Sequence, residues 1–126
     1  MRKKIIAGNW KMNLDIDAAN KLYSEGMSIW PETREDKAVM IFPPSIYLQD
    51  FIQRNNGRFE IGAQNLSPYE NGAYTGEISA SQLKSIGCSM VLVGHSERRI
   101  LYEEHEEVLK QKIESALKHG LKVIYC

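Results

Sequence analysis

Short runs of apolar, mostly β-branched residues recur along the chain. Longer stretches separate them, in which apolar residues return every three or four positions. The short runs are typical of β-strands. They predict five strands, over residues 4–7, 38–42, 59–63, 90–93 and 122–125. Because these runs are apolar at nearly every position, we expect strands that are covered on both faces rather than solvated on one.

The stretches between the first three runs have helical periodicity. One face of each predicted helix is apolar, as expected of a helix that packs against a sheet. The positions on this face are Ala18, Leu22 and Tyr23 in the first helix, and Ile46, Phe51 and Ile52 in the second.

Two further helices are predicted. The third begins after Ser79 or Ser81, both suitable N-caps, and stops at Gly87, where a left-handed C-cap fits. The four glutamates between Glu103 and Glu107 suit the first turns of the fourth, which residues 118–120 close. The apolar face of the fourth helix consists of Val108, Leu109, Ile113, Ala116 and Leu117.

The predicted elements alternate as βαβαβαβαβ. Strands linked through helices form a parallel sheet with right-handed crossovers, so the sequence predicts an α/β protein with one domain over residues 1–126. The fifth run has no helix after it, and an uncovered last strand would leave a sheet edge open. We therefore expect a truncated chain, marginally stable on its own.

Composition narrows the classes of function. The 126 residues are 43% hydrophobic and 25% charged, and sixteen basic residues balance sixteen acidic ones, which favours neither nucleic acid nor a lipid surface as partner. No apolar run reaches the roughly 20 residues of a membrane span, and residues 1–8 do not resemble a secretory signal, so we expect a cytoplasmic protein. The two cysteines, Cys88 and Cys126, are expected to be buried free thiols.

Polar residues with matching spacing follow two of the predicted strands. Asn9 and Lys11 follow the first strand, and His95 and Glu97 follow the fourth. Ligands bind at the carboxyl ends of parallel strands, and a spacing of two keeps side chains on one side of an extended backbone. We therefore expect these four groups on one rim. The alternative, which spacing alone favours, is solvated charges or a structural Lys–Glu pair.

The histidines and the paired arginines have different expected roles. His95 lies at a strand-to-helix junction, where the helix N-terminus would hold the imidazole neutral and ready to donate a hydrogen bond. His105 and His119 lie on the predicted fourth helix, so a surface role is expected, and the three histidines show no metal-ligand spacing. Arg98 and Arg99 either clamp a phosphate or, as we favour, form structural ion pairs.

Four strings of residues closely resemble the triosephosphate isomerase family. They are residues 7–13, 62–65, 71–79 and 93–99, each near the end of a predicted strand. The resemblance covers the whole chain and implies the first four βα units plus the fifth strand of a TIM (β/α)8 barrel. It also implies interconversion of dihydroxyacetone phosphate and D-glyceraldehyde 3-phosphate through an enediolate, with no cofactor and no metal.

The resemblance assigns roles to individual residues. Asn9 and Lys11 match the family's substrate-binding pair, and Lys11 also supports catalysis by helping to stabilise the enediolate. His95 matches the residue that polarises the carbonyl and moves protons, and Glu97 matches a catalytic carboxylate beside the lysine. The family's base is a glutamate beyond the sixth strand, which this chain lacks. We therefore expect the 126 residues alone to be essentially inactive.

The resemblance further implies a homodimer in the intact enzyme. The loop over residues 64–77 matches one whose tip enters a neighbouring subunit, and Tyr74, Thr75 and Gly76 match the inserted tip. From the residues alone, the loop could equally fold back on its own chain. Glu103 stands where many relatives have glycine, which puts the local helix geometry in doubt.

Two other functions stay open at this stage. The chain could be a non-catalytic half-barrel that assembles with itself through its open sheet edges. A different enzyme of phosphate chemistry on the same barrel is the more distant alternative.

Overall fold

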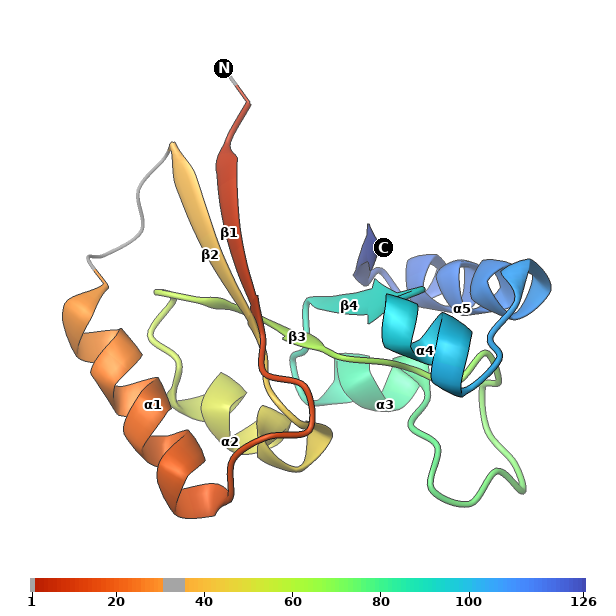
Figure 1. The fold of residues 1–126 in the computed structure, drawn as a ribbon, viewed down its shortest axis with the longest axis horizontal. Helices are drawn as coiled ribbons and strands as arrows, with labels where there is room; N and C mark the ends of the chain where they lie inside the picture. Colours follow the sequence, from red (N-terminus) through yellow and green to blue (C-terminus); the bar gives the residue numbers. More distant parts are fainter. Residues whose placement is uncertain (1, 31–35) are drawn as a thin grey trace.

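The computed structural model describes residues 2–30 and 36–126. Within these ranges five parallel strands form one sheet, ordered as they occur in the chain. They are β1 (Lys4–Asn9), β2 (Lys37–Phe42), β3 (Glu60–Ala63), β4 (Met90–Val93) and β5 (Lys122–Tyr125). All five predicted strands are confirmed, and Figure 1 shows the sheet curling with helices along its outer side.

The helices are α1 (Ile16–Ile29), α2 (Ser45–Arg54), α3 (Ala80–Ser85), α4 (Ser96–Leu101) and α5 (Glu106–Lys118). Ser79, one of the two predicted caps, begins α3 in a capping box with Gln82. Gly87 follows α3 with φ +87°, as the predicted left-handed C-cap requires.

The prediction of where the fourth helix begins is wrong. Glu103 and Glu104 do not belong to its first turn, because α4 ends at Leu101 and α5 begins at Glu106, whereas Glu106 and Glu107 do lie in that turn. Between the two helices Glu103 has φ +52°, in the left-handed region that favours glycine. The structure therefore confirms that the backbone around Glu103 departs from regular helix geometry, as the sequence led us to suspect.

The sheet has an apolar cluster on each face. The larger cluster lies between the sheet and the outer helices, with Phe51 and Leu48 of α2 fully buried. The smaller one lies on the inner face and consists of Ala38, Met40, Phe42, Met90 and Leu92. Gly62 leaves room for it, because a Cβ there would lie 2.4 Å from the Phe42 ring and 2.5 Å from Met90.

The expectation of strands covered on both faces is wrong for the two edge strands. β4 is buried at every position, whereas β1 is exposed along its length and β5 at both ends. Ile5 is 58% exposed and Tyr125 is 58% exposed. Cys126 is exposed as well, so only Cys88 is the buried free thiol that we expected.

Among the residues that the structure describes, no helix is long and apolar enough to cross a membrane.

Candidate functional site

The loop after β1 holds Lys11 in an unusual backbone conformation. Lys11 has φ +56°, which costs a side-chain-bearing residue free energy. Its N–H donates to the Asn9 side-chain oxygen at 3.0 Å, and the Asn13 amide donates to the Trp10 carbonyl at 2.9 Å. These two hydrogen bonds hold the loop that contains Lys11 in this conformation.

Gln64 completes this arrangement from the end of β3. Its side-chain amide donates to the carbonyl oxygens of Lys11 at 2.9 Å and of Phe42 at 2.8 Å. The Phe42 carbonyl also accepts the Trp10 N–H at 3.1 Å. The sequence places Gln64 in one of the four strings that resemble the family and at the start of a loop, but assigns it no role. The signal that could have found it is its position directly after a strand, the same rule that found Asn9 and His95.

His95 lies where β4 passes into α4 and acts as the N-cap of that helix. Its Nδ1 accepts the backbone N–H of Glu97 at 3.3 Å, so we assign the ring proton to Nε2. A Glu97 carboxylate oxygen lies 3.5 Å from Nδ1, which is longer than the roughly 2.7–2.9 Å of a charge-assisted hydrogen bond. This geometry is that of a neutral imidazole with Nε2–H as its donor.

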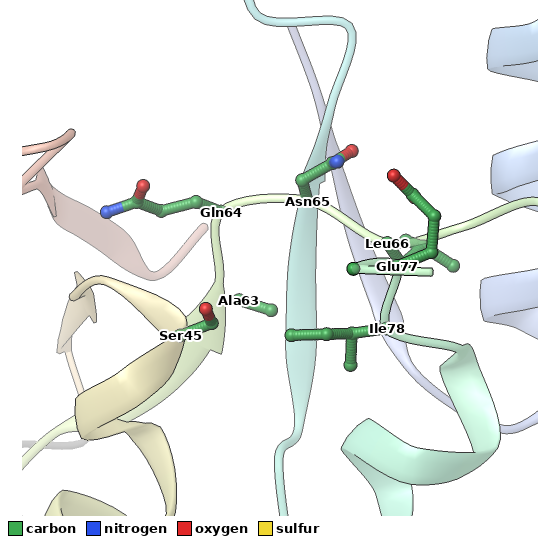
Figure 2. A pocket seen from close by; sticks show the side chains of 8 residues that line it. Ser45, Ala63, Gln64, Asn65, Leu66, Glu77 and Ile78 are labelled. Atoms are coloured by element: carbon green, nitrogen blue, oxygen red, sulfur yellow. The ribbon is translucent and has the colours of Figure 1, made fainter. Parts of the chain in front are cut away.

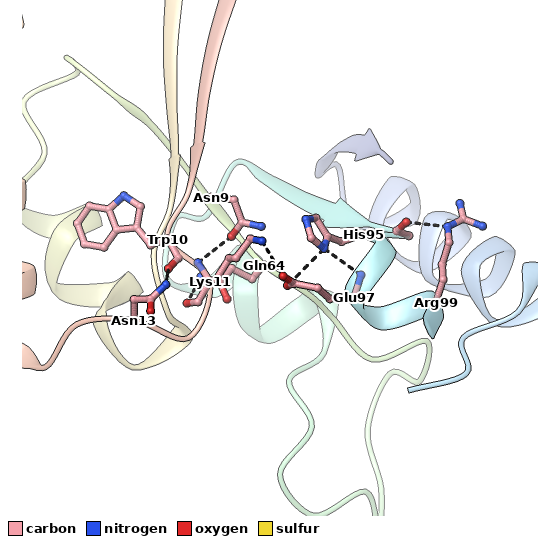
Figure 3. Close-up of polar contacts among 9 residues, drawn as sticks. Asn9, Trp10, Lys11, Asn13, Gln64, His95, Glu97 and Arg99 are labelled. Atoms are coloured by element: carbon pink, nitrogen blue, oxygen red, sulfur yellow. Dashed lines mark hydrogen bonds and ion pairs between the residues drawn. The ribbon is translucent and has the colours of Figure 1, made fainter. Parts of the chain in front are cut away.

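Lys11 and Glu97 meet across the mouth of the sheet. The Lys11 ammonium lies 2.6 Å from Oε1 of Glu97, although the residues are 86 positions apart in the chain. The hydrogen bond from Lys11 lowers the pKa of the Glu97 carboxyl, and loss of solvent around the carboxylate opposes this. Figure 3 shows Asn9, Lys11, His95 and Glu97 gathered at the carboxyl ends of β1 and β4.

These four predicted site residues line one cleft of about 160 Å³. Arg98 lines it too, but its guanidinium pairs with Glu104 at 2.7 Å, which makes it the structural ion pair that we favoured over a phosphate clamp. The cleft therefore offers an ammonium for a small anion, an imidazole N–H donor and a carboxylate. Within the described ranges no group of three or more His, Cys, Asp or Glu residues could hold a metal ion.

A second cleft, of about 180 Å³, lies beside the first. Figure 2 shows that Gln64 and Asn65 line it together with Ser45 at the start of α2 and with Glu77 and Ile78 of the following loop. Glu77 is the only ionisable residue among its lining residues. The lining of the second cleft thus has a carboxylate and no cation, whereas the first cleft has the Lys11 ammonium beside its carboxylate. The first cleft is therefore the better candidate for a phosphorylated substrate.

The residues predicted for a dimer interface do not line the cleft that contains Lys11 and His95, although Gly76 lines the second cleft. Tyr74, Thr75 and Gly76 belong to an exposed loop tip that projects from the sheet between β3 and α3 (Figure 1). The ring of Tyr74 stacks on Tyr69, with centroids 4.1 Å apart. The tip thus has internal order but does not fold back onto Lys11 or His95.

The other two histidines lie outside the cleft, as expected. His105 is exposed and caps α5 without a side-chain hydrogen bond. His119 lies at the other end of α5 and is paired with Glu70 at 2.8 Å. Lys118 pairs with the same carboxylate at 2.7 Å, so this cluster joins α5 to the loop after β3.

A curled parallel sheet with helices outside and polar groups at the carboxyl ends of its strands defines the class of (β/α)8-barrel proteins. The family model described as "Triosephosphate isomerase" matches residues 4–126. Triosephosphate isomerase of Marinobacter nauticus is 45% identical over 126 residues, and that of Flavobacterium psychrophilum is 42% identical over 127. Triosephosphate isomerase of Shewanella sediminis is 41% identical over 135.

The chain therefore belongs to the triosephosphate isomerase family. Each of these alignments covers 100% of this chain but only 50% or 51% of the relative. The chain spans about half the length of the curated relatives it matches, and it corresponds to four βα units and the fifth strand of the barrel.

Proposed function

We propose that this chain supplies one half of a triosephosphate isomerase that interconverts dihydroxyacetone phosphate and D-glyceraldehyde 3-phosphate. The observation that carries the proposal is the cleft in which Lys11, His95 and Glu97 meet. Residues 1–126 then form part of a single barrel domain. Family membership and the names of the relatives support the reaction.

Each polar group in the cleft has a role in this reaction. The Lys11 ammonium attracts the triose phosphate and stabilises the enediolate, and Asn9 assists in binding. His95 donates from Nε2 to the substrate oxygen that gains charge, since its Nδ1 already accepts the Glu97 N–H. Glu97 orients the ammonium through their 2.6 Å contact and takes part in proton movement.

We propose that the 126 residues alone are essentially inactive. In the reaction that we assign, a base must remove a carbon-bound proton, and such a base typically contributes about two to four powers of ten in rate. The four groups that meet in the cleft are an amide, a lysine paired with Glu97, a histidine whose Nδ1 is occupied, and that glutamate. The resemblance to the family assigns the removal of the carbon-bound proton to none of these four groups but to a glutamate beyond the sixth strand, outside residues 1–126.

The test joins residues 1–126 to the carboxyl-terminal half of the Marinobacter nauticus relative, in a protein that we call the joined barrel. We expect the joined barrel to turn over glyceraldehyde 3-phosphate in a coupled assay, while the 126-residue chain does not. A joined barrel that unfolds cooperatively but shows no turnover would overturn the proposed reaction. Near-normal turnover by the chain alone would overturn the proposed inactivity.

We also propose a homodimer that uses the loop tip with Tyr74, Thr75 and Gly76. The exposure of the tip and its ordered tyrosine stack support a docking role. Sedimentation of the joined barrel tests it, since a tip variant such as Thr75→Glu should shift the dimer toward monomer.

We also propose a cytoplasmic location. The exposed free thiol of Cys126 supports a reducing compartment.

A second candidate function is self-association of the half-barrel without catalysis. The apolar exposure of the edge strands, with Ile5 58% and Ile6 49% exposed, favours it for the isolated chain. Sedimentation of the 126-residue chain over a dilution series tests it. A folded, dilute monomer would contradict self-association.

A further inference from the structure

The chain turns from β4 into α4 through Gly94 and His95. Gly94 is buried and has φ +80°, a conformation that glycine adopts without strain. A Cβ at this position would lie 2.8 Å from Nη2 of Arg99 and 3.1 Å from the carbonyl oxygen of Cys126. The Arg99 guanidinium therefore fills the space in which a side chain at position 94 would stand.

Arg99 holds both peptide groups that flank His95. Its Nε donates to the Gly94 carbonyl oxygen at 2.7 Å (Figure 3), and its backbone N–H donates to the His95 carbonyl oxygen at 3.1 Å. The first carbonyl belongs to the peptide before His95 and the second to the peptide after it. The φ and ψ angles of His95 describe how these two planar groups are rotated about its Cα. The His95 carbonyl also accepts the Arg98 N–H at 2.9 Å, as the first turn of α4 requires, so the contribution of the Arg99 side chain is to hold the peptide before His95.

The same guanidinium connects this turn to the neighbouring strand. Its Nη2 donates to the Cys126 carbonyl oxygen at 2.7 Å, and the Cys126 N–H donates to the Val93 carbonyl oxygen at 2.9 Å. The guanidinium carbon also lies 5.2 Å from the centre of the Tyr125 ring. The turn that carries His95 is thus anchored to the end of β5 as well as to its own helix.

We propose that Arg99 is a positioning residue for His95, an inference that rests on the proposed function. Arg99 is absent from the lining of the cleft, and its two side-chain hydrogen bonds go to backbone carbonyls. It is therefore neither the phosphate clamp nor the ion pair considered from the sequence. The Arg99 side chain holds the peptide that enters His95, the first turn of α4 holds the peptide that leaves it, and the Glu97 N–H holds its ring.

A positioning role and a merely structural role predict different kinetics. If Arg99 only stabilises the fold, removing it lowers the fraction of folded protein, and the folded molecules keep their kcat and KM. If it positions His95, the folded protein binds substrate normally but reacts slowly. A misplacement of about 1 Å can cost about 100-fold in rate, whereas binding through Lys11 is retained.

The experiment compares Arg99→Met, Arg99→Lys and the control Arg54→Met in the joined barrel. Arg54 also makes two polar side-chain contacts, to Asn20 and Asp50 at 2.6 Å each, but it lies on α2. We expect Arg99→Met to lower kcat about 10- to 100-fold with KM nearly unchanged, while Arg54→Met leaves both unchanged in the folded protein. Arg99→Lys keeps the charge but not the fork of donors, so it should restore little.

Two further readouts make the outcome decisive. In Arg99→Ala, added guanidinium ion should recover part of the lost kcat, because it can occupy the vacated space over Gly94. In ¹⁵N-histidine spectra of the joined barrel, Arg99→Met should shift the ring-nitrogen signals of His95 and leave those of His119 in place. A kcat within about threefold of the unsubstituted protein, with unshifted His95 signals, would overturn the proposal.

The two proposals fail separately. If the unsubstituted joined barrel folds but does not turn over substrate, the proposed reaction is wrong, and the His95 spectra still decide whether Arg99 positions that residue. If the unsubstituted protein is active and Arg99→Met retains its kcat, only the inference about Arg99 is wrong.

Discussion

Two lysine–glutamate pairs in this molecule have the same chemistry and nearly the same length but opposite surroundings. Lys11 and Glu97 lie 2.6 Å apart at the mouth of the sheet, and their side chains are 48% and 44% exposed. Lys112 of α5 and Glu104, in the segment between α4 and α5, lie 2.5 Å apart, and their side chains are only 4% and 8% exposed. The difference in exposure means that a small molecule can reach the first pair, whereas the second is closed off from solvent.

The buried pair is part of a larger network. Lys112 also donates to the Asn65 side-chain oxygen at 2.8 Å, and Arg98 donates to Glu104 at 2.7 Å. Burial alone would raise the pKa of Glu104, but the hydrogen bonds and charges of Lys112 and Arg98 outweigh it and lower that pKa. Burial lowers the pKa of Lys112, and Glu104 opposes this. The network holds the loop after β3 against α4 and α5.

Replacing Glu104 with Gln should lower the free energy of unfolding more than any other substitution considered below, because it leaves the buried Lys112 ammonium without its counter-charge. Breaking a buried pair by removing one partner costs about 3–5 kcal/mol. Urea unfolding of the joined barrel should show a loss of this size. The control is Glu114→Gln, an exposed substitution on α5, the helix that carries Lys112. An equally small loss of stability in both variants would show that the pair of Glu104 and Lys112 does not stabilise the fold.

Replacing Lys11 with Met should remove activity and leave stability nearly intact. Loss of one preorganised electrostatic contact to a developing charge typically costs about 100- to 1000-fold in kcat. Steady-state kinetics and thermal unfolding of the joined barrel measure the two effects side by side. Lys21→Met, an exposed lysine on α1, should alter neither. A marked loss of stability in Lys11→Met would mean that the exposed pair also supports the fold.

Acid should weaken the buried pair through Glu104. Because the pKa of Glu104 is lowered in the folded protein, its carboxylate adds stability above the ordinary carboxyl value of 4.5. Below that value the unfolded chain binds a proton that the folded chain does not, so this stability is lost as the pH falls through the folded pKa. Urea unfolding from pH 7 to pH 3 should show the gap between the unsubstituted protein and Glu104→Gln closing. A gap that is constant with pH would contradict this.

The sequence predicts the exposed pair better than the buried one. Lys11 and Glu97 are found because each follows a strand, and all carboxyl ends of parallel strands meet at one edge. Glu104 and Lys112 follow no such rule, because their contact depends on how α4 and α5 pack. The glutamates between Glu103 and Glu107 suit a helix start, but the tertiary pairing of Glu104 keeps the first two outside α5.

The parts of the fold that the sequence misses have similar causes. All five strands are predicted because an apolar run is a local signal. The exposure of Ile5 in β1 is not predicted, because it depends on what lies beyond the sheet edge. The contacts of Gln64 and Arg99 to backbone carbonyls depend on the left-handed turns at Lys11 and Gly94, which no side-chain pattern reveals.

A residue with left-handed backbone lies in or next to each pair, which allows a test with a smaller expected effect. Lys11 itself has φ +56°, whereas beside the buried pair the strained residue is Glu103, with φ +52°. The left-handed conformation costs a side-chain-bearing residue roughly 1 kcal/mol more than glycine. Glu103→Gly should therefore stabilise the joined barrel by about 0.5–1 kcal/mol in urea unfolding, without changing kcat. Destabilisation would show that the Glu103 side chain contributes more than the strain costs.

The smallest effect on stability should come from Glu97→Gln. Exposed ion pairs contribute little to folding because water already solvates both charges, and the Lys11 ammonium stays solvated when its partner is neutral. The thermal midpoint of this variant of the joined barrel should match that of Glu107→Gln, an exposed substitution on α5, while kcat falls because Lys11 loses its orienting carboxylate. A lowered midpoint together with an unchanged kcat would show that the exposed pair stabilises the fold and does not act in catalysis, contrary to what its exposure predicts.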